Sequence, residues 1–222
     1  ELRILAHMSE DPGLLEAFHD GRDIHSATSS LVYEVPIEEV TADMRRVAKV
    51  LNFGVLYGLT PFGIIQQTDL TAEQGRQFID AYFTSYPGIK DYIDASIQAC
   101  QQAGYVASLG GRRRYLPEIN SSNRQAKAAA ERAAINMPVQ GTAADIIKLA
   151  MLRMQGKFDE MGMQTRMILQ VHDELVFECP TGESDALAVL LRAEMPAAME
   201  LKVPLEIEVK AGPNWGQMEP LG

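Results

Sequence analysis

The chain has 222 residues, 46% of them hydrophobic, which is enough for one sizeable core or two small ones. It contains no uninterrupted apolar run of about 18 residues, and this argues against a membrane span. The two cysteines, Cys100 and Cys179, are far apart in the sequence, which excludes a disulfide framework or a CxxC metal site and favours a reducing, cytoplasmic compartment. The net charge of −10 argues mildly against nucleic-acid binding.

The charge is unevenly distributed along the chain. Residues 1–43 hold ten acids and two bases, residues 44–177 twelve acids and fifteen bases, and residues 178–222 eight acids and three bases. A local basic stripe can hold phosphates although the whole chain is acidic, and a solvated helix face is the alternative. The clustered bases of the middle segment are Arg45, Arg46, Lys49, Arg112, Arg113, Arg114, Arg124, Lys127 and Arg132.

Helical periodicity dominates the first half of the chain. Pro36 opens a short element, and Thr41 is the expected N-cap of the helix that follows it. Thr71 with Gln74 fits a capping box, and Gly104 is a natural helix stop. The predicted helices cover residues 1–10, 13–20, 25–33, 42–58, 71–83 and 87–103.

The second half is predicted to mix helices with short strands. Residues 105–117 form a basic hairpin around two glycines, and Pro138 with Gly141 is expected to separate an Ala-rich helix over about 123–136 from another over 142–160. Beyond these, we predict a hairpin of strands 166–171 and 174–179, a helix over 183–200 and a strand over Leu205–Lys210.

The predicted helix 42–58 contains RRVAKVLNFGVLYG, in which two cations and two aromatic residues recur every four positions. Arg45, Lys49, Phe53 and Tyr57 would therefore lie within an arc of about 120°. Cations suit the phosphates of a nucleoside triphosphate, and rings can stack near its sugar and base. An ordinary amphipathic helix with exposed cations and half-buried rings is the alternative.

The predicted hairpin MILQVHDELVFE presents carboxylates at its turn. Asp173 follows His172 in the turn, and Glu174 opens the next strand. Rigid carboxylates suit Mg²⁺, which prefers oxygen ligands, and divalent ions promote phosphoryl transfer. Taken alone, the segment favours a plain polar turn, because Asp is common in turns.

A third pattern lies in AERAAINMPVQGTAAD. Arg132, Asn136 and Gln140 are four residues apart, although Pro138 makes the position of the last one less regular. One cation and two amides in a row can reach phosphates, sugars and base edges. A solvent-exposed face explains the same spacing equally well.

Together and in this order, the segments resemble those of family A DNA polymerases, the family of bacterial DNA polymerase I. RRVAKVLNFGVLYG is similar to that family's fingers-helix motif, VHDE to its palm carboxylate motif, and ELRILAHMSE to the end of its first palm motif. GRRRYLPEI and ERAAINMPVQGTAAD match the intervening segments, so the resemblance covers essentially the whole chain.

The resemblance implies an α+β fold, with an antiparallel palm sheet, palm helices and an inserted α-helical fingers subdomain. Residues 1–12 and 123–222 would belong to the palm and residues 13–122 to the fingers, with the thumb absent. The implied reaction is template-directed DNA synthesis. A primer 3′-hydroxyl attacks the α-phosphate of a deoxynucleoside triphosphate (dNTP), and pyrophosphate leaves.

The resemblance also assigns roles to single residues. Arg45, Lys49 and His25 would meet the triphosphate. Phe53 would lie beside the sugar 3′ position, Tyr57 would guard the templating base, and Glu1 would exclude a ribose 2′-hydroxyl. The implied primer–template contacts are Arg112, Arg113, Arg132, Asn136, Gln140 and His172.

In the same resemblance, Asp173 is a metal-binding catalytic aspartate and Glu174 its auxiliary carboxylate, with two Mg²⁺ ions expected in the complete enzyme. The family's other metal-binding aspartate lies five residues before the position of Glu1. We therefore expect the chain to be inactive alone and to need an N-terminal remainder with the thumb and the first palm strand. The other expected partners are primer–template DNA and dNTP, for a monomeric protein without membrane attachment.

Two other functions stay open at this stage. A non-catalytic nucleotide- or DNA-binding module would keep the basic helix and use the carboxylates only structurally. A small metal-dependent phosphohydrolase built on Asp173 and Glu174 would hydrolyse nucleotides without a template.

Overall fold

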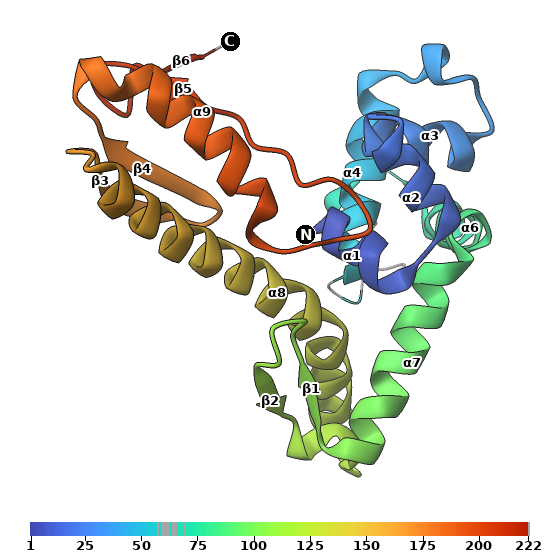
Figure 1. The fold of residues 1–222 in the computed structure, drawn as a ribbon. Coiled ribbons are helices and arrows are strands. Elements are labelled where there is room, and N and C mark those ends of the chain that lie inside the picture. The colour runs from blue at the N-terminus through green and yellow to red at the C-terminus, as the bar shows by residue number, and fades with distance from the viewer. Residues whose placement is uncertain (57, 59–62, 64–65, 69, 222) are drawn as a thin grey trace. The chain divides into compact units, whose positions relative to one another are not determined.

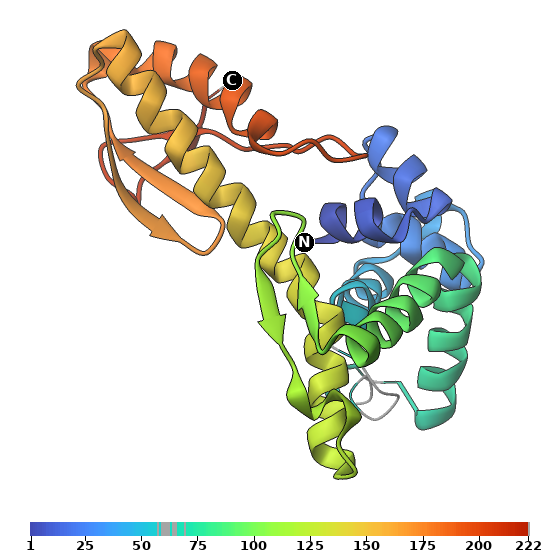
Figure 2. The same cartoon turned by 60° about the horizontal axis from the view of Figure 1, so that its bottom comes forward.

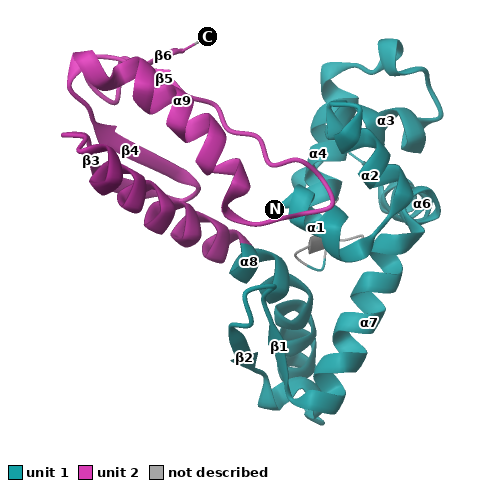
Figure 3. Ribbon diagram, in the orientation of Figure 1, with its two compact units in different colours: residues 1–142 teal, residues 143–222 magenta. Residues whose placement is uncertain are grey.

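The computed structural model describes residues 1–56, 58, 63, 66–68 and 70–221. The chain divides into two compact units, residues 1–142 and 143–222 (Figure 3). It is a mixed protein, in which helices predominate and the strands of the described part form three two-stranded antiparallel sheets. In the same part, no helix is both long and apolar enough to cross a membrane.

Helices form most of unit 1 (Figure 1). Side chains cap several of them: Asp11 Oδ1 accepts from Leu14 N at 3.1 Å, and Thr71 with Gln74 forms the predicted capping box. The observed bounds agree with the sequence prediction to within two residues wherever the structure describes them. The helices are α1 (Leu2–Ser9), α2 (Pro12–His19), α3 (Ile24–Tyr33), the 3₁₀ turn η1 (Ile37–Glu39), α4 (Ala42–Leu56), α6 (Ala72–Ser85) and α7 (Pro87–Ala103).

The core of unit 1 includes a buried polar link between helices. Asp11 is fully buried, and its second carboxylate oxygen accepts from Gly88 N at the start of α7, at 2.9 Å. A side chain at Gly88 would lie 2.9 Å from the Asp11 Cα, so the approach of α7 to α2 requires glycine. The large side chains of this unit that are less than 2% exposed include Leu5, Leu14, Leu51, Tyr82, Tyr86 and Ile89.

The predicted basic hairpin is present in unit 1. Strand β1 (Tyr105–Ala107) pairs with β2 (Arg113–Tyr115), and η2 (Pro117–Asn120) follows. In the views of Figures 1 and 2 the hairpin lies beside the first half of α8 (Arg124–Met161). A shared cluster joins α7, the hairpin and α8; its buried members are Cys100, Val106, Leu116, Ile119, Ala130, Ala134 and Met137.

The prediction of two helices separated at Pro138 and Gly141 is wrong, because α8 is one helix of 38 residues. Proline inside a helix removes one N–H and crowds the preceding turn, at a cost of about 3 kcal/mol. Side chains support the backbone on both sides: Tyr92 donates its hydroxyl to Ile135 O at 3.0 Å, and Thr142 donates to Pro138 O at 2.7 Å. Packing along α8 thus outweighs the local signal.

Unit 2 is built on the predicted carboxylate-bearing hairpin. Strand β3 (Arg166–Val171) pairs with β4 (Glu174–Glu178), with an irregular register between Met167 and Leu169. The end of α8 and α9 (Ser184–Glu194) pack on the hairpin. Their shared core contains Met154, Phe158, Leu187 and Leu191, with Met167 and Phe177 from the hairpin packed against them.

The C-terminal part contains less helix and strand than the sequence predicted. The helix expected to residue 200 ends at Glu194, and the 3₁₀ turns η3 (Thr181–Glu183) and η4 (Pro196–Ala198) lie on either side of it. Residues 205–210 do alternate between half-buried and exposed, but they are not a strand: only β5 (Lys210–Ala211) pairs, with β6 (Glu219–Pro220). The alternation reflects packing of Ile207 and Val209 on the unit 2 core.

Candidate functional site

Helices α3 and α4 lie against one another in unit 1 and bring several predicted nucleotide-binding residues together. The His25 and Phe53 rings meet with centroids 5.7 Å apart and planes tilted by 47°. Arg45 forms a two-point ion pair with Asp23, Nε to Oδ1 at 3.1 Å and Nη2 to Oδ2 at 2.7 Å. Lys49 lies one turn along α4 between Arg45 and Phe53. The pair of helices therefore presents cations beside aromatic rings.

Electrostatics around this group favour a neutral His25 and a charged Asp23. Burial lowers the pKa of His25, and the positive charges of Arg45 and Lys49 act in the same direction against the opposing charge of Asp23. The hydrogen bond from Arg45 holds the pKa of Asp23 well below its ordinary value. The Asp23–Arg45 pair therefore stays charged at neutral pH, beside a histidine that stays neutral.

Sequence reasoning missed a buried polar group behind these residues. Asn52 and Thr28 are fully buried, and Asn52 Nδ2 lies 3.0 Å from Thr28 Oγ1 and 3.1 Å from His25 Nδ1. The signal was available in the periodicity, because Asn52 shares the buried stripe of α4 with Ala48 and Leu51. A buried amide on an apolar stripe requires hydrogen-bond partners, which points to a neighbouring polar residue.

Two further residues were predicted to bind the nucleotide. Tyr57 lies outside the residues that the structure describes. Glu1 is exposed at the N-cap of α1, where its backbone carbonyl accepts from Leu5 N at 2.9 Å. Their predicted roles at the templating base and the ribose 2′ position remain predictions.

In unit 2, the turn between β3 and β4 places its polar side chains in solvent. His172 adopts a left-handed conformation with φ 53°, and its carbonyl accepts from Gln170 Nε2 at 3.2 Å. Asp173 is exposed, and Glu174 accepts from Trp215 Nε1 at 2.6 Å. Trp215 is a further member of this site that the sequence did not reveal.

The turn fits part of a metal site. Asp173 offers a hard oxygen donor, as Mg²⁺ prefers, but one carboxylate of the pair is already held by Trp215. Within the described residues, no three His, Cys, Asp or Glu side chains gather where they could hold a metal ion. The donor set found there is therefore incomplete for a metal centre.

The first half of α8 carries the predicted row of polar side chains. Arg132 and Gln140 are exposed and Asn136 is half-buried; because α8 runs unbroken past Pro138, the three keep their helical spacing. Asn136 Oδ1 is buried, and none of the described groups donates to it. A Cβ at Gly58 would lie 2.7 Å from Arg132 Cγ, so Gly58 lies close against Arg132.

The β1–β2 hairpin combines arginines with aromatic rings. The Arg113 guanidinium lies 4.6 Å from the centre of the Tyr105 ring, which in turn meets the Tyr115 ring at 5.6 Å. Tyr115 is 68% exposed, and Arg112 donates its backbone N–H to Ser108 Oγ at 3.2 Å. Charged guanidinium groups held on aromatic faces are suited to binding phosphates and bases.

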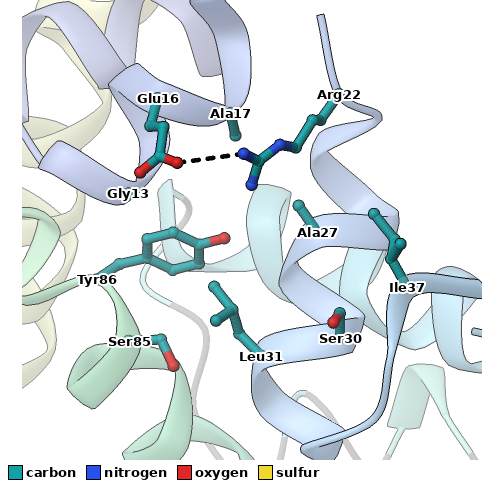
Figure 4. Close-up of a pocket in the computed structure, with 10 residues that line it drawn as sticks. All are labelled: Gly13, Glu16, Ala17, Arg22, Ala27, Ser30, Leu31, Ile37, Ser85 and Tyr86. Carbon is teal, nitrogen blue, oxygen red and sulfur yellow. Dashed lines mark hydrogen bonds and ion pairs between the residues drawn. The ribbon is translucent and has the colours of Figure 1, made fainter. Parts of the chain in front are cut away.

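A separate cavity of about 460 Å³ is lined by residues of α2 and α3 and by Ser85 and Tyr86 (Figure 4). Its charged side chains are Glu16 and Arg22, which pair with one another at 3.1 Å across it. Leu31 and the Tyr86 ring form apolar parts of its wall. The cation of the cavity, Arg22, is paired with Glu16, whereas the α3–α4 surface carries Lys49 in addition to the paired Arg45, so the cavity is the weaker candidate for a triphosphate.

A family model described as DNA polymerase family A matches residues 1–217. The chain belongs to DNA polymerase family A. Over 97% of its length it is 47% identical to DNA polymerase I of Mycobacterium tuberculosis and 46% identical to the DNA polymerases I of Geobacillus stearothermophilus and Bacillus subtilis. The chain spans 24% of the length of each of these relatives.

A solved structure also matches the fold of this family A chain. The POL domain of Pol1 from M. smegmatis, in complex with DNA primer-template and dNTP, has a TM-score of 0.89 and 46% sequence identity. The match covers 92% of this chain and 36% of that one. Family A DNA polymerases use divalent metal ions.

Proposed function

We propose that the chain is the part of a DNA polymerase that binds the incoming dNTP and contributes to template-directed DNA synthesis. The 3′-oxygen of the primer forms a bond to the α-phosphorus, the bond from that phosphorus to the bridging oxygen breaks, and pyrophosphate leaves. The observation that carries the proposal is the α3–α4 surface of a family A chain, where His25 and Phe53 lie together beside the cations of α4.

In this proposal, the triphosphate binds to Arg45, Lys49 and His25. The ion pair with Asp23 uses Arg45 Nε and Nη2, and a guanidinium has five N–H donors in all, so Nη1 can donate to a phosphate while the pair persists. Phe53 supports the sugar, Tyr57 the templating position, and Glu1 disfavours a ribose. Positioning and charge stabilisation would supply most of the catalysis.

The remaining assignments concern DNA and metal. The proposed primer–template contacts are Arg112, Arg113, Arg132, Asn136, Gln140 and His172, and the M. smegmatis neighbour is a complex with DNA primer-template. We assign Asp173 as one ligand of Mg²⁺ and Glu174 as its auxiliary. Mg²⁺, when bound, would stabilise charge on the reacting phosphates.

The subdomain boundaries belong to the same proposal. Residues 13–122 would form the fingers, and residues 1–12 with 123–222 the palm, of a monomeric cytoplasmic enzyme. The compact units divide instead at Thr142, within α8, so the proposed boundary follows function and not compactness alone.

The test is templated nucleotide incorporation by a polymerase that contains these 222 residues. We expect each of the four dNTPs to be added only opposite its complementary template base, with pyrophosphate released in equal amount. A binding module would retain DNA or nucleotide without extending the primer. A phosphohydrolase would consume nucleotide without a template, and either result would contradict the proposal.

A further inference from the structure

A series of buried hydrogen bonds connects residues of α3 to their neighbours and ends at His25. Thr28, Asn52 and Tyr86 are each 0% exposed, and they connect α3, α4 and the start of α7. Tyr86 Oη lies 3.2 Å from Thr28 Oγ1, and Tyr86 also lines the cavity of Figure 4. This series of hydrogen bonds therefore links the interior of unit 1 to the His25 ring, which we propose faces the nucleotide.

The Thr28 hydroxyl is the centre of these hydrogen bonds. A threonine hydroxyl has one proton and two acceptor sites. Its shortest contact is with the Ile24 carbonyl at 2.8 Å, an oxygen that can only accept, so the hydroxyl proton lies there. Thr28 Oγ1 then accepts from Asn52 Nδ2 at 3.0 Å and from the Tyr86 hydroxyl at 3.2 Å, and the amide oxygen of Asn52 lies 3.2 Å from the same Oγ1.

The same amide reaches His25 with its nitrogen. Because the Thr28 proton is directed at Ile24 O, the nearer amide atom at Thr28 Oγ1 is the donor Nδ2, at 3.0 Å against 3.2 Å for Oδ1. Asn52 Nδ2 also lies 3.1 Å from His25 Nδ1. An amide nitrogen donates and does not accept, so Nδ1 must be the acceptor.

A histidine whose Nδ1 accepts carries its proton on Nε2 when it is neutral. The ring is also held by the Phe53 ring at 5.7 Å. The charged groups that act on it are Asp23 on α3 and Arg45 and Lys49 on α4. Proton position and ring orientation are thus both set by neighbours on α3 and α4.

We propose that Asn52 is a positioning residue that holds His25 in the Nε2–H form, so that this N–H donates to a phosphate oxygen of the bound dNTP. The inference rests on the proposed function for its ligand, whereas the tautomer itself does not depend on it. Thr28 supports Asn52 in this role, because its hydroxyl oxygen accepts from the same Asn52 Nδ2 that lies beside His25 Nδ1.

The tautomer is measured by nitrogen NMR on the chain labelled at histidine. The sequence has four histidines, and a His25→Gln variant identifies the signals of His25. We expect the Nε2–H form in the wild type and in Thr28→Ser, which keeps the hydroxyl. Thr28→Val keeps the shape of the side chain but removes the hydroxyl, and should give a mixture of tautomers. Asn52→Asp should move the proton to Nδ1, which then donates to the new carboxylate.

Binding is measured with thymidine triphosphate on the same variants, after a thermal melt shows that each is folded. We expect Thr28→Val and Asn52→Asp to bind about tenfold more weakly, the size of one hydrogen bond to a charged group, and Thr28→Ser to bind normally. Asn123→Asp is the charge control, because Asp replaces Asn at the exposed start of α8 without loss of an N-cap. Thr28→Val adds no charge, so its weaker binding cannot come from repulsion.

Three results would overturn the inference: a wild-type His25 protonated at Nδ1, unchanged thymidine triphosphate affinity in a folded variant whose tautomer has changed, or failure of the nucleotide to perturb the His25 signals. The proposed function fails differently. If the nucleotide binds at His25 with the expected tautomer but the complete polymerase shows no templated extension, DNA synthesis is contradicted and the role of Asn52 is supported.

Discussion

Asn52 illustrates what single positions contribute to the site. The four-residue spacing of Arg45, Lys49 and Phe53 predicted one functional face of α4, whereas Asn52 lies on the buried face and reaches the same site through His25. Spacing along one helix predicts which side chains share a face. It does not show which residue of a second helix meets them, because this depends on tertiary packing. The Asp23–Arg45 pair was missed for the same reason.

Lys49 is expected to bind the triphosphate. In a polymerase that contains this chain, Lys49→Ala should weaken nucleotide use by at least about 1.5 kcal/mol, because a hydrogen bond to a charged group is lost. Steady-state kinetics with a varied dNTP concentration measures this. Lys90→Ala, at an exposed position of α7, is the matched control and should leave the kinetics unchanged. Equal kinetics for the two variants would contradict the assignment.

Phe53 is expected to influence which sugars are accepted. A phenyl ring offers no hydroxyl in place of a missing substrate 3′-hydroxyl, so a dideoxynucleotide leaves a polar gap. Phe53→Tyr would supply that hydroxyl and should relax discrimination against dideoxynucleotides. The measurement is a competition between deoxy- and dideoxynucleotide at a single template position. The assignment is wrong if both proteins give the same discrimination ratio.

The two carboxylates of the β3–β4 turn should differ in importance. Asp173 is exposed and available as a ligand, whereas Glu174 is held by Trp215. Asp173→Ala should therefore reduce single-turnover incorporation far more than Glu174→Ala does. Asp173→Asn, which keeps the size but removes the charge, serves as a second variant. Near-normal rates for Asp173→Ala at saturating Mg²⁺ would refute its role as a metal ligand.

At the scale of elements, local signals predicted helices well where caps and periodicity agreed. Thr71 with Gln74 and the stop at Gly104 are examples. The signals failed where distant contacts decided the outcome. Pro138 does not end α8, because Tyr92 and Thr142 support its backbone. Residues 205–209 alternate in burial, but no strand of the described part pairs with them, and pairing begins at Lys210. A short stretch of sequence shows neither that Tyr92 contacts α8 nor whether a strand pairs with residues 205–209.

Tyr92 should make the protein sensitive to alkali. Burial raises its pKa to about 12, against the opposing effect of a hydrogen bond with Ser96. The unfolded chain releases this proton near pH 10, so the stability contribution is intact below pH 10 and is lost as the pH rises toward 12, by roughly 2–3 kcal/mol. Other buried tyrosines act in the same direction; the pKa values of Tyr82 and Tyr86 are also raised.

Urea unfolding at several pH values tests this. Tyr92→Phe should cost about 1 kcal/mol at neutral pH through the lost bond to Ile135 O, and should flatten the decline above pH 10. Tyr115→Phe is the matched control, because that ring is 68% exposed. An unchanged pH profile in Tyr92→Phe would show that another group causes the alkaline loss.

At the scale of the whole molecule, the net charge and the local basic clusters predict opposite effects on DNA binding. The chain carries −10 overall, yet the α4 helix, the β1–β2 hairpin and the first half of α8 carry the basic clusters. The acids that outnumber them lie mainly before residue 44 and after residue 177. The proposed DNA binding would therefore depend on local phosphate contacts, because the long-range field is repulsive.

The salt dependence of DNA binding should therefore report on the hairpin arginines individually. For a polymerase that contains this chain, the logarithm of the affinity for primer–template DNA should fall linearly with the logarithm of the salt concentration. Arg113→Ala should reduce the slope by about 1, because one phosphate contact and its released counterion are lost. Arg113→Lys keeps the charge but changes the contact with the Tyr105 ring, so it should keep the slope even if affinity falls.

Arg22→Ala is the control: it removes an arginine that is paired with Glu16 and Asp20 in the acidic segment, and should leave the slope unchanged. Fluorescence anisotropy at a series of potassium chloride concentrations measures all four proteins. A wild-type slope in Arg113→Ala would show that Arg113 does not contact a DNA phosphate, whereas an equal reduction in Arg22→Ala would show that the slope depends on total charge and not on the hairpin.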